Sequence, residues 1–235
     1  MNYWQRTTLL IGLPLTLLAT AAVHQPPTPK PLPTTGPQSH HLVKIDNDGA
    51  SLPEWSGPWS CVCDKSTGLL WEVKTDDESI HDGLWTYSWY RETEPYFTHA
   101  AAAISAPQAP ETGTANGGDC YFEPDRCDTS DLIRRTRAQA LCGESNWRLP
   151  TAEELRSLIY ADGKAGQPTI NTAFFPKTKR GDYWTSDYGT PLQGVYKYLG
   201  TGAEAINFVK GQQVTIPHRN AAFVRLVSEN SKSCH

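Results

Sequence analysis

The six cysteines of this chain are the residues whose chemistry depends most directly on spacing. A zinc site favours tight Cys-x-x-Cys pairs, and neither Cys61/Cys63 nor Cys120/Cys127 has that spacing. An even number of cysteines in an exported chain instead predicts three disulfides, although six cysteines allow many connectivities. We therefore expect disulfides, with no metal site and no cofactor.

The position of each cysteine suggests its partner. Cys61 and Cys63 lie two residues apart in a strand-like segment, so their side chains share one face of the strand and reach two different partners. One partner should lie at a helix end and the other at the C-terminus, while the remaining two cysteines close a local loop. The predicted pairs are Cys61–Cys142, Cys63–Cys234 and Cys120–Cys127.

Aromatic residues and clustered cations are the candidate ligand-binding groups. Trp85, Tyr87 and Trp89 alternate in a strand-like segment, a pattern that serves either sheet packing or stacking on a ligand. Two basic clusters have the chemistry to hold sulfate or carboxylate groups, although each also fits a solvated face. The candidate binding residues are Trp85, Trp89, Tyr90, Tyr96, Arg134, Arg135, Arg137, Lys177, Lys179 and Arg180.

Catalytic and calcium-binding motifs are incomplete in the sequence. Nucleophile-elbow and metal-ligand helix motifs are missing, and His81 and His99 are isolated histidines beside the aromatic segment. Residues 46–49 start like a calcium loop, but Gly57 stands where that loop requires a glutamate, so we expect a plain turn. We predict that the chain is not an enzyme.

The N-terminal residues predict export followed by a tether. Arg6 and the apolar run Leu9–Leu18, followed by small residues, have the pattern of a signal peptide over residues 1–21. The apolar run is well short of the roughly 20 residues that span a bilayer, so we expect no integral membrane segment after signal cleavage. Residues 22–41 are proline-rich and predict an extended linker, either a spacer or a plain disordered tail.

The remaining residues, 42–235, suit one globular domain. The formal net charge of −4 leaves no broad basic surface, so nucleic acid is not an expected partner. Eight tryptophans predict a large buried aromatic area. The oligomeric state stays open.

The junction at residues 146–155 should position much of this domain. Pro150 favours an extended backbone before it, while Thr151 and Glu154 have the spacing of a capping box that starts a helix. We expect this helix to end near Asp162-Gly163. The residues expected to be structural are Trp71, Trp147, Arg148, Pro150, Thr151, Glu154 and Trp184.

The rest of the chain supplies one more helix and several strands. A helix is expected from Asp128 to Gly143, with Leu132, Ile133, Ala140 and Leu141 on its buried side. Two helices among mainly antiparallel strands predict an α+β domain. Strands are expected at 42–45, 59–64, 69–74, 85–89, 183–186, 194–199, 205–209, 212–216 and, as a central strand, 222–227.

Several motifs together resemble a known family. They are Trp59-Ser60-Cys61, Thr67-Gly68-Leu69-Leu70-Trp71-Glu72, Cys127-Asp128-Thr129, Leu141-Cys142-Gly143, Trp147-Arg148-Leu149-Pro150-Thr151, Tyr183-Trp184-Thr185-Ser186 and Val224-Arg225-Leu226-Val227. In this order they resemble the bacterial C-terminal domain of Legionella collagen-like protein (Lcl). The resemblance covers nearly all of Leu42–Ser228, and it implies a C-type-lectin-like fold, export and adhesion through glycans.

The resemblance leaves three functions to weigh. The first is an exported binding domain for a glycan or a cell-surface protein, located in the periplasm, at the cell surface or outside the cell. The alternative is a structural subunit or tip component of a surface appendage or envelope assembly. An enzyme related to formylglycine-generating enzymes would need active-site cysteines, which the predicted disulfides occupy. Glu123-Pro124-Asp125 is similar to a lectin sugar motif but is out of place, so no calcium requirement is expected.

Overall fold

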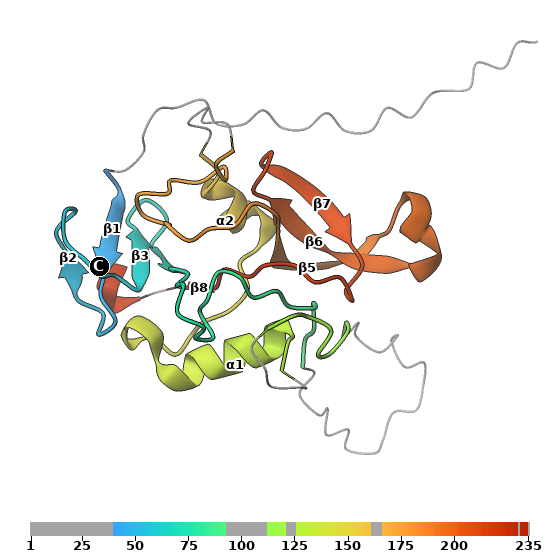
Figure 1. Cartoon of the computed structure of the whole chain (residues 1–235), viewed down its shortest axis with the longest axis horizontal. Helices are drawn as coiled ribbons and strands as arrows, with labels where there is room; N and C mark the ends of the chain where they lie inside the picture. The colour runs from blue at the N-terminus through green and yellow to red at the C-terminus, as the bar shows by residue number, and fades with distance from the viewer. Residues whose placement is uncertain (1–39, 93–111, 121–125, 161–165, 230, 235) are drawn as a thin grey trace, which may run out of the picture. The chain divides into compact units, whose positions relative to one another are not determined.

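Figure 1 shows the computed structural model, which describes residues 40–92, 112–120, 126–160, 166–229 and 231–234. Several sequence predictions lie outside these residues: the signal peptide at 1–21, nearly all of the linker at 22–41, Tyr96, His99, Glu123–Asp125 and Asp162-Gly163. Among the described helices, none has the length and apolar character needed to cross a membrane.

The first sheet contains five antiparallel strands in the order β2-β1-β3-β4-β8. The predicted hairpin is confirmed, because Cys61 pairs with Glu72 and Asp64 pairs with Leu69. Gly68 closes its turn at a φ of 72°, a conformation that glycine adopts without strain. The strands are β1 (Leu42–Ile45), β2 (Ser51–Leu52), β3 (Cys61–Asp64), β4 (Leu69–Glu72) and β8 (Val227–Ser228).

The predicted central strand at 222–227 is wrong in extent and position. Within the predicted segment only Val227 belongs to a strand, β8, which pairs with β4 and stands last in the strand order of the sheet. The residues before β8 form only isolated β-bridges, such as the one between Ala222 and Tyr87. Arg148 pairs with Val227 through two backbone hydrogen bonds of 2.9 Å. The segment before Pro150 is therefore extended, as predicted, and it pairs with the end of the chain.

The second sheet is a meander of β5 (Asp182–Pro191), β6 (Thr201–Asn207) and β7 (Gln212–Ile216). The predicted turn between β6 and β7 is confirmed, with Gly211 at a φ of 68°. The predicted strand at 194–199 is wrong. Residues Gly194–Leu199 form a 3₁₀ helix, η2, that connects β5 to β6 and buries none of its side chains.

The two predicted helices start where expected and end earlier. In α1 (Thr129–Gln139) the Asp128 side chain accepts a hydrogen bond from the backbone N–H of Asp131. Ala140, at a φ of 50°, ends α1 and is exposed rather than buried, and the 3₁₀ helix η1 (Leu141–Gly143) follows. In α2 (Ala152–Ser157) the capping box of Thr151 is present. The chain then leaves the helix, since the Tyr160 N–H donates to the Thr169 carbonyl at 3.0 Å.

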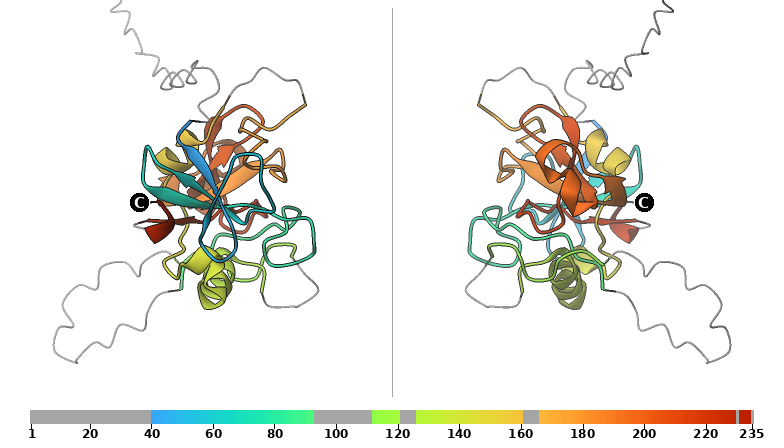
Figure 2. Two further views of the ribbon diagram at one scale, coloured as in Figure 1. Left: turned by 90° about the vertical axis from the view of Figure 1, so that its left-hand side faces the viewer. Right: turned by 90° about the vertical axis from the view of Figure 1, so that its right-hand side faces the viewer.

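Alternating side chains place the five-stranded sheet between the two helices. Cys61 and Cys63 face a core cluster that includes Leu132 of α1, whereas Val62 between them faces a second cluster that includes Leu155 of α2. Figures 1 and 2 show α1 on one side of this sheet and α2 on the other. Both clusters also contain residues of the second sheet, so this sheet contributes to the core on both faces of the first sheet.

Three disulfides tie these elements together, in the same pairs as the sequence predicts. Each pair has a Cα–Cα distance within the range that a disulfide requires. The 3₁₀ helix η3 (Lys232–Cys234) carries the last cysteine back to β3. The pairs are Cys61–Cys142 at 6.4 Å, Cys63–Cys234 at 5.4 Å and Cys120–Cys127 at 5.4 Å. Mixed helix and antiparallel sheet with three disulfides make this an α+β domain.

Candidate functional site

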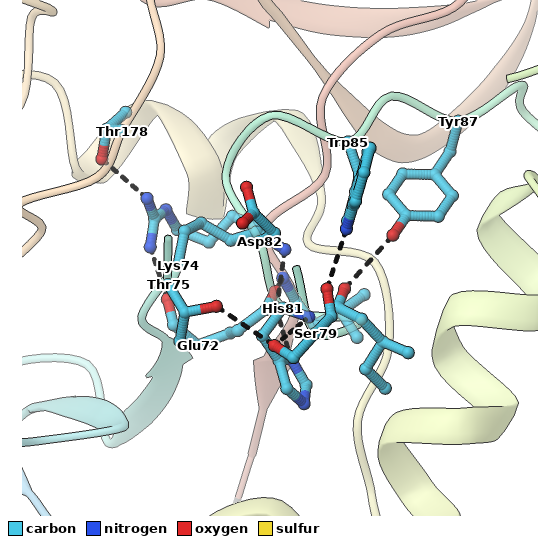
Figure 3. A network of polar contacts seen from close by, with 12 residues as sticks. Glu72, Lys74, Thr75, Ser79, His81, Asp82, Trp85, Tyr87 and Thr178 are labelled. Carbon is cyan, nitrogen blue, oxygen red and sulfur yellow. Dashed lines mark hydrogen bonds and ion pairs between the residues drawn. The ribbon is translucent and has the colours of Figure 1, made fainter. Parts of the chain in front are cut away.

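A buried network of charged side chains lies where β4 leads into the following loop (Figure 3). Glu72 Oε1 accepts hydrogen bonds from Lys74 Nζ and from His81 Nδ1, each at 2.8 Å. Its second oxygen accepts from the backbone N–H of Leu226 at 2.9 Å. Arg225 donates to the Glu72 carbonyl and, at 2.7 Å, to the hydroxyl of Thr178. The network therefore joins three segments that are distant in sequence.

Burial and ion pairing have opposite effects on the pKa of Glu72. Burial acts to raise its pKa, but Lys74 and His81 together outweigh burial and lower the pKa to about 2. Burial lowers the pKa of Lys74, although Glu72 acts in the opposite direction. Glu72 and Arg225 are 0% exposed and Lys74 is 4% exposed, so these charges face one another rather than solvent. The arrangement braces the fold.

His81, one of the isolated histidines of the sequence, is part of this brace. Its Nε2 lies 2.9 Å from the side-chain oxygen of Gln139 at the end of α1, so the ring spans the distance between β4 and α1. Both ring nitrogens are thus engaged. Trp85, predicted to bind a ligand, is half-buried and donates from its indole to the Ser79 carbonyl at 2.8 Å.

The aromatic segment at 85–89 is not a strand of either sheet, although Tyr87 and Trp89 belong to one core cluster and Trp85 packs against it. It pairs through isolated bridges, and the consecutive residues Tyr87, Ser88 and Trp89 are all buried. Trp89 is 1% exposed, and its indole donates to the Thr185 carbonyl at 2.9 Å. The prediction that Trp89 stacks on a ligand is therefore wrong, because its ring is enclosed by the second sheet.

Trp89 instead supports a set of aromatic and cationic residues nearer the surface. Its ring centroid lies 5.2 Å from that of Tyr188 and 4.9 Å from that of His218. Tyr188 is 39% exposed and carries the guanidinium of Arg91 at 4.5 Å from its ring centroid. This contact holds a cation against an exposed aromatic ring at the edge of the β5–β6 hairpin.

The end of the same hairpin is the most exposed apolar part of the second sheet. Val195, Tyr196 and Tyr198 of η2 are 79%, 40% and 76% exposed. Figure 1 shows η2 as the coil that projects beyond β5 and β6. Arg219, which follows β7, donates to the Tyr198 hydroxyl at 3.4 Å. We refer to Arg91, Tyr188, Tyr196, Lys197, Tyr198 and Arg219 together as the aromatic tip.

Lys197 and Arg219 of the aromatic tip have no carboxylate close by in the sequence, whereas Glu92 follows Arg91 and Asp187 precedes Tyr188. No Asp or Glu occurs at residues 188–203 or 205–228. Glu204, between these ranges, is 7% exposed and accepts hydrogen bonds from Gln213 at 3.2 Å and Thr215 at 3.0 Å. Lys197 and Arg219 therefore give the tip a positive character that net charge does not reveal.

The predicted basic clusters are partly neutralised by neighbouring carboxylates. Asp131 forms ion pairs with Arg134 and, at 3.7 Å, with Arg135, and the Nε of Arg137 donates to the Trp147 carbonyl at 2.7 Å. Lys177 pairs with Asp76 at 2.7 Å and lowers the pKa of that carboxyl.

The remaining predicted binding residues are dispersed. Lys179 is half-buried and its backbone N–H donates to the hydroxyl of Tyr183 at 2.9 Å, whereas Arg180 is exposed. Tyr90 is half-buried and pairs with Gly113. The predicted binding residues thus occupy several separate surfaces rather than one.

The residues expected to be structural behave as such. Trp71, Trp147 and Trp184 are 0% exposed. Arg148 forms two hydrogen bonds of 2.8 Å with the carboxylate of Glu154, so it braces the start of α2. Pro150 is buried, and its carbonyl accepts from the Ser186 N–H at 2.8 Å.

An open hollow of about 770 Å³ lies beside this junction. Its walls include the carboxylates of Glu153, Glu154 and Glu229. Glu154 is paired with Arg148, and Arg148 also lies 3.4 Å from Glu229, so two of the three acidic groups already have a cation. Because the three carboxylates share the single cation of Arg148, the hollow keeps a net negative charge.

Comparison with known proteins identifies the family. A search of the curated proteins and of the solved structures finds no significant match. The family model of the Lcl C-terminal domain matches residues 60–228, from the residue before β3 to the end of β8. This range covers well over half of the chain and includes every motif from Cys61 to Val227. The chain therefore belongs to the Lcl C-terminal domain family.

Proposed function

We propose that this chain is an exported, non-catalytic bacterial domain that binds glycans through the aromatic tip, in a C-type-lectin-like framework. The observation that carries the proposal is the exposure of Tyr196 and Tyr198 beside Lys197 and Arg219. Aromatic side chains without a packing role are the kind of surface that binding sites use. Membership of the Lcl C-terminal domain family, together with three disulfides, agrees with an exported bacterial domain.

The chemistry of the tip suits a sugar that carries anionic groups. Tyrosine rings offer a flat apolar face to the C–H face of a pyranose, and their hydroxyls bond to sugar hydroxyls. Lys197 and Arg219 supply charge-assisted hydrogen bonds for sulfate or carboxylate groups. The Arg91 guanidinium lies over the Tyr188 ring, and this contact orders one edge of the aromatic tip before a ligand binds.

The tip is a better candidate than the two basic clusters of the sequence. Asp131 partly neutralises the basic cluster on α1 through ion pairs, and Asp76 does the same for the cluster at 177–180. Neither cluster has an exposed aromatic ring among its described contacts, whereas the tip combines rings and cations.

The test is binding of the full-length protein to a glycan array and to immobilised heparin as a sulfated probe. The double variant Tyr196→Ala/Tyr198→Ala should lose roughly tenfold or more in affinity, because two exposed rings contribute about 1 kcal/mol each. Its fold should be intact, since η2 buries no side chain.

The matched control is Arg134→Gln/Arg135→Gln on α1, which should keep at least half of the binding. A tip variant that binds as well as the wild-type protein, or a control that loses binding instead, would contradict the proposal. Co-purification with envelope proteins and no retention on any glycan would favour the structural-subunit alternative.

A further inference from the structure

Trp55 is exposed to an extent that packing does not explain. It is 87% exposed, the largest value among the large apolar side chains that the structure describes. Trp71, Trp89, Trp147 and Trp184 are all buried in the interior. Single exposed aliphatic residues are common on protein surfaces, but tryptophan has the largest apolar surface to hide and rarely stands free.

The backbone around Trp55 is held on both sides. Buried Lys44 donates from Nζ to the carbonyls of Glu54 at 2.7 Å and Ser56 at 3.4 Å, the two residues that flank Trp55. The Ser56 N–H donates to the Pro53 carbonyl at 2.9 Å, which closes a turn with Trp55 at its corner. The projecting indole is therefore presented by an ordered turn.

A second set of contacts anchors the end of this turn. The Lys44 ammonium lies 3.8 Å from the ring centroid of Trp59. The Trp59 indole in turn donates to the Phe174 carbonyl at 2.9 Å, which joins the turn to a distant segment. Because the backbone that carries Trp55 is already held, this turn loses little conformational entropy when Trp55 meets a ligand, which favours binding.

The surroundings of Trp55 favour a sugar over a membrane or an apolar protein surface. Ser51 and Glu54 are exposed close to it in the sequence, as are Pro53 and Pro58, so polar groups and small apolar rings accompany the indole. Lys44, the cation that bonds to the backbone on both sides of Trp55, is 9% exposed and directed at these carbonyls, so it is not free for lipid phosphate. A pyranose meets both features, because its C–H face stacks on the indole while its hydroxyls bond to the carboxylate and the serine.

We infer that Trp55 is a second carbohydrate contact, a stacking platform for a neutral pyranose. The turn that carries it directly follows β2, which lies at the opposite end of Figure 1 from η2 and the aromatic tip. The domain therefore has two separate contact points, one for anionic and one for neutral sugar. The ligand class of this inference, a sugar, rests on the proposed function, whereas the choice of Trp55 as the contact residue does not.

The test uses quenching of tryptophan fluorescence by acrylamide in the full-length protein. The difference between the wild-type and Trp55→Phe emission isolates the signal of Trp55. Cellohexaose and chitohexaose are the probes, because their pyranoses have flat, unsubstituted C–H faces. At least one of them should reduce quenching of Trp55 at least twofold, and Trp55→Ala should weaken its binding by roughly tenfold, with Trp55→Phe weakening it less.

The controls separate this inference from the proposed function. If neither oligosaccharide protects Trp55, or if Trp55→Ala binds the sugar unchanged, the inference is overturned. Protection by phosphatidylglycerol vesicles but not by either sugar also overturns it in favour of a lipid surface. Heparin binding is measured on the same proteins. Heparin binding that survives Tyr196→Ala/Tyr198→Ala overturns the proposed function alone, and heparin binding that survives Trp55→Ala is expected.

Discussion

At the residue scale, Glu72 is the group on which the buried network converges. One carboxylate accepts from a lysine, a histidine and a backbone N–H, and the backbone carbonyl of the same residue accepts from Arg225. Removal of one partner from a buried ion pair leaves the other charge without compensation, which is costly. The sequence motifs contain both Glu72 and Arg225 but do not indicate that the two residues meet.

Acid should destabilise the protein through Glu72. The pKa is about 2 in the folded protein, below the ordinary value of 4.5, so the stabilisation is fully present above pH 4.5 and is lost as the pH falls towards 2. The shift corresponds to about 3 kcal/mol of unfolding free energy. Urea unfolding of the wild-type protein at pH 7 and pH 3 measures the loss.

The variant Glu72→Gln isolates this contribution. It should be less stable than the wild-type protein at pH 7 by about 3–5 kcal/mol, because Lys74 stays buried without its counter-charge. Its own loss of stability between pH 7 and pH 3 should be smaller than that of the wild-type protein. The exposed Glu54→Gln should follow the wild-type curve, and an unchanged acid dependence in Glu72→Gln would refute the role of Glu72.

At the element scale, α2 depends on its start because it is only six residues long. Thr151 accepts from the Glu154 N–H at 3.2 Å, and Glu154 accepts from the Thr151 N–H at 2.8 Å. Thr151→Ala should lower the unfolding free energy by about 1 kcal/mol. Ser157→Ala at the other end of α2 should change it by less than about 0.5 kcal/mol. Equal effects in chemical unfolding would contradict the capping-box argument.

A glycine holds the aromatic segment against its neighbour. Gly113 has a φ of +84°, and a Cβ placed on it would lie 2.3 Å from the carbonyl oxygen of Trp89. Gly68 has a φ of +72° with nothing within 4 Å of such a Cβ. Gly113→Ala should therefore destabilise the protein by more than about 2 kcal/mol, and Gly68→Ala by about 1 kcal/mol from backbone strain alone. Thermal unfolding of both variants checks this order.

Elements determined by neighbouring residues are predictable from the sequence, and elements determined by distant residues are not. The capping box and the Gly68 hairpin need only local residues, and both are as predicted. The segment 194–199 was predicted as a strand, but no strand of the described residues pairs with it, and it forms η2 instead. Gly194 and Gly200, both at positive φ, are the local signal of a turn at its two ends.

The candidate site follows the same rule. Trp89 was predicted to stack on a ligand because its sequence neighbours are aromatic, yet Thr185 and Tyr188 of β5 enclose it. The aromatic tip was missed because Arg91 meets Tyr188, and Arg219 meets Tyr198, only in the folded chain. Sequence spacing predicts which residues share an element, whereas long-range packing decides which of them reach the surface.

At the scale of the whole molecule, two disulfides span most of the domain. Cys61–Cys142 joins β3 to η1 across 81 residues, and Cys63–Cys234 joins β3 to η3 across 171 residues. Both half-cystines in β3 face the α1 cluster, so this strand is tied to two distant segments from one face. Cys120–Cys127 closes a loop of only 7 residues of separation and lies nearer the surface.

The two long-range disulfides should therefore dominate the stability of the fold. A cross-link that closes a longer loop removes more conformational entropy from the unfolded chain, and loss of such a bond costs about 2–5 kcal/mol. Cys63→Ala/Cys234→Ala should lower the melting temperature more than Cys120→Ala/Cys127→Ala, because it also frees the C-terminal 3₁₀ helix from β3. Differential scanning calorimetry compares the melting temperatures of the two double variants, each of which lacks one disulfide. If the short-loop variant melts at the lower temperature, local contacts around residues 86–90 rather than chain entropy govern stability, because Ser88 bonds to the carbonyl of Cys127 at 3.3 Å. Retention of heparin binding in Cys120→Ala/Cys127→Ala would then place the aromatic tip outside the region that the short disulfide supports.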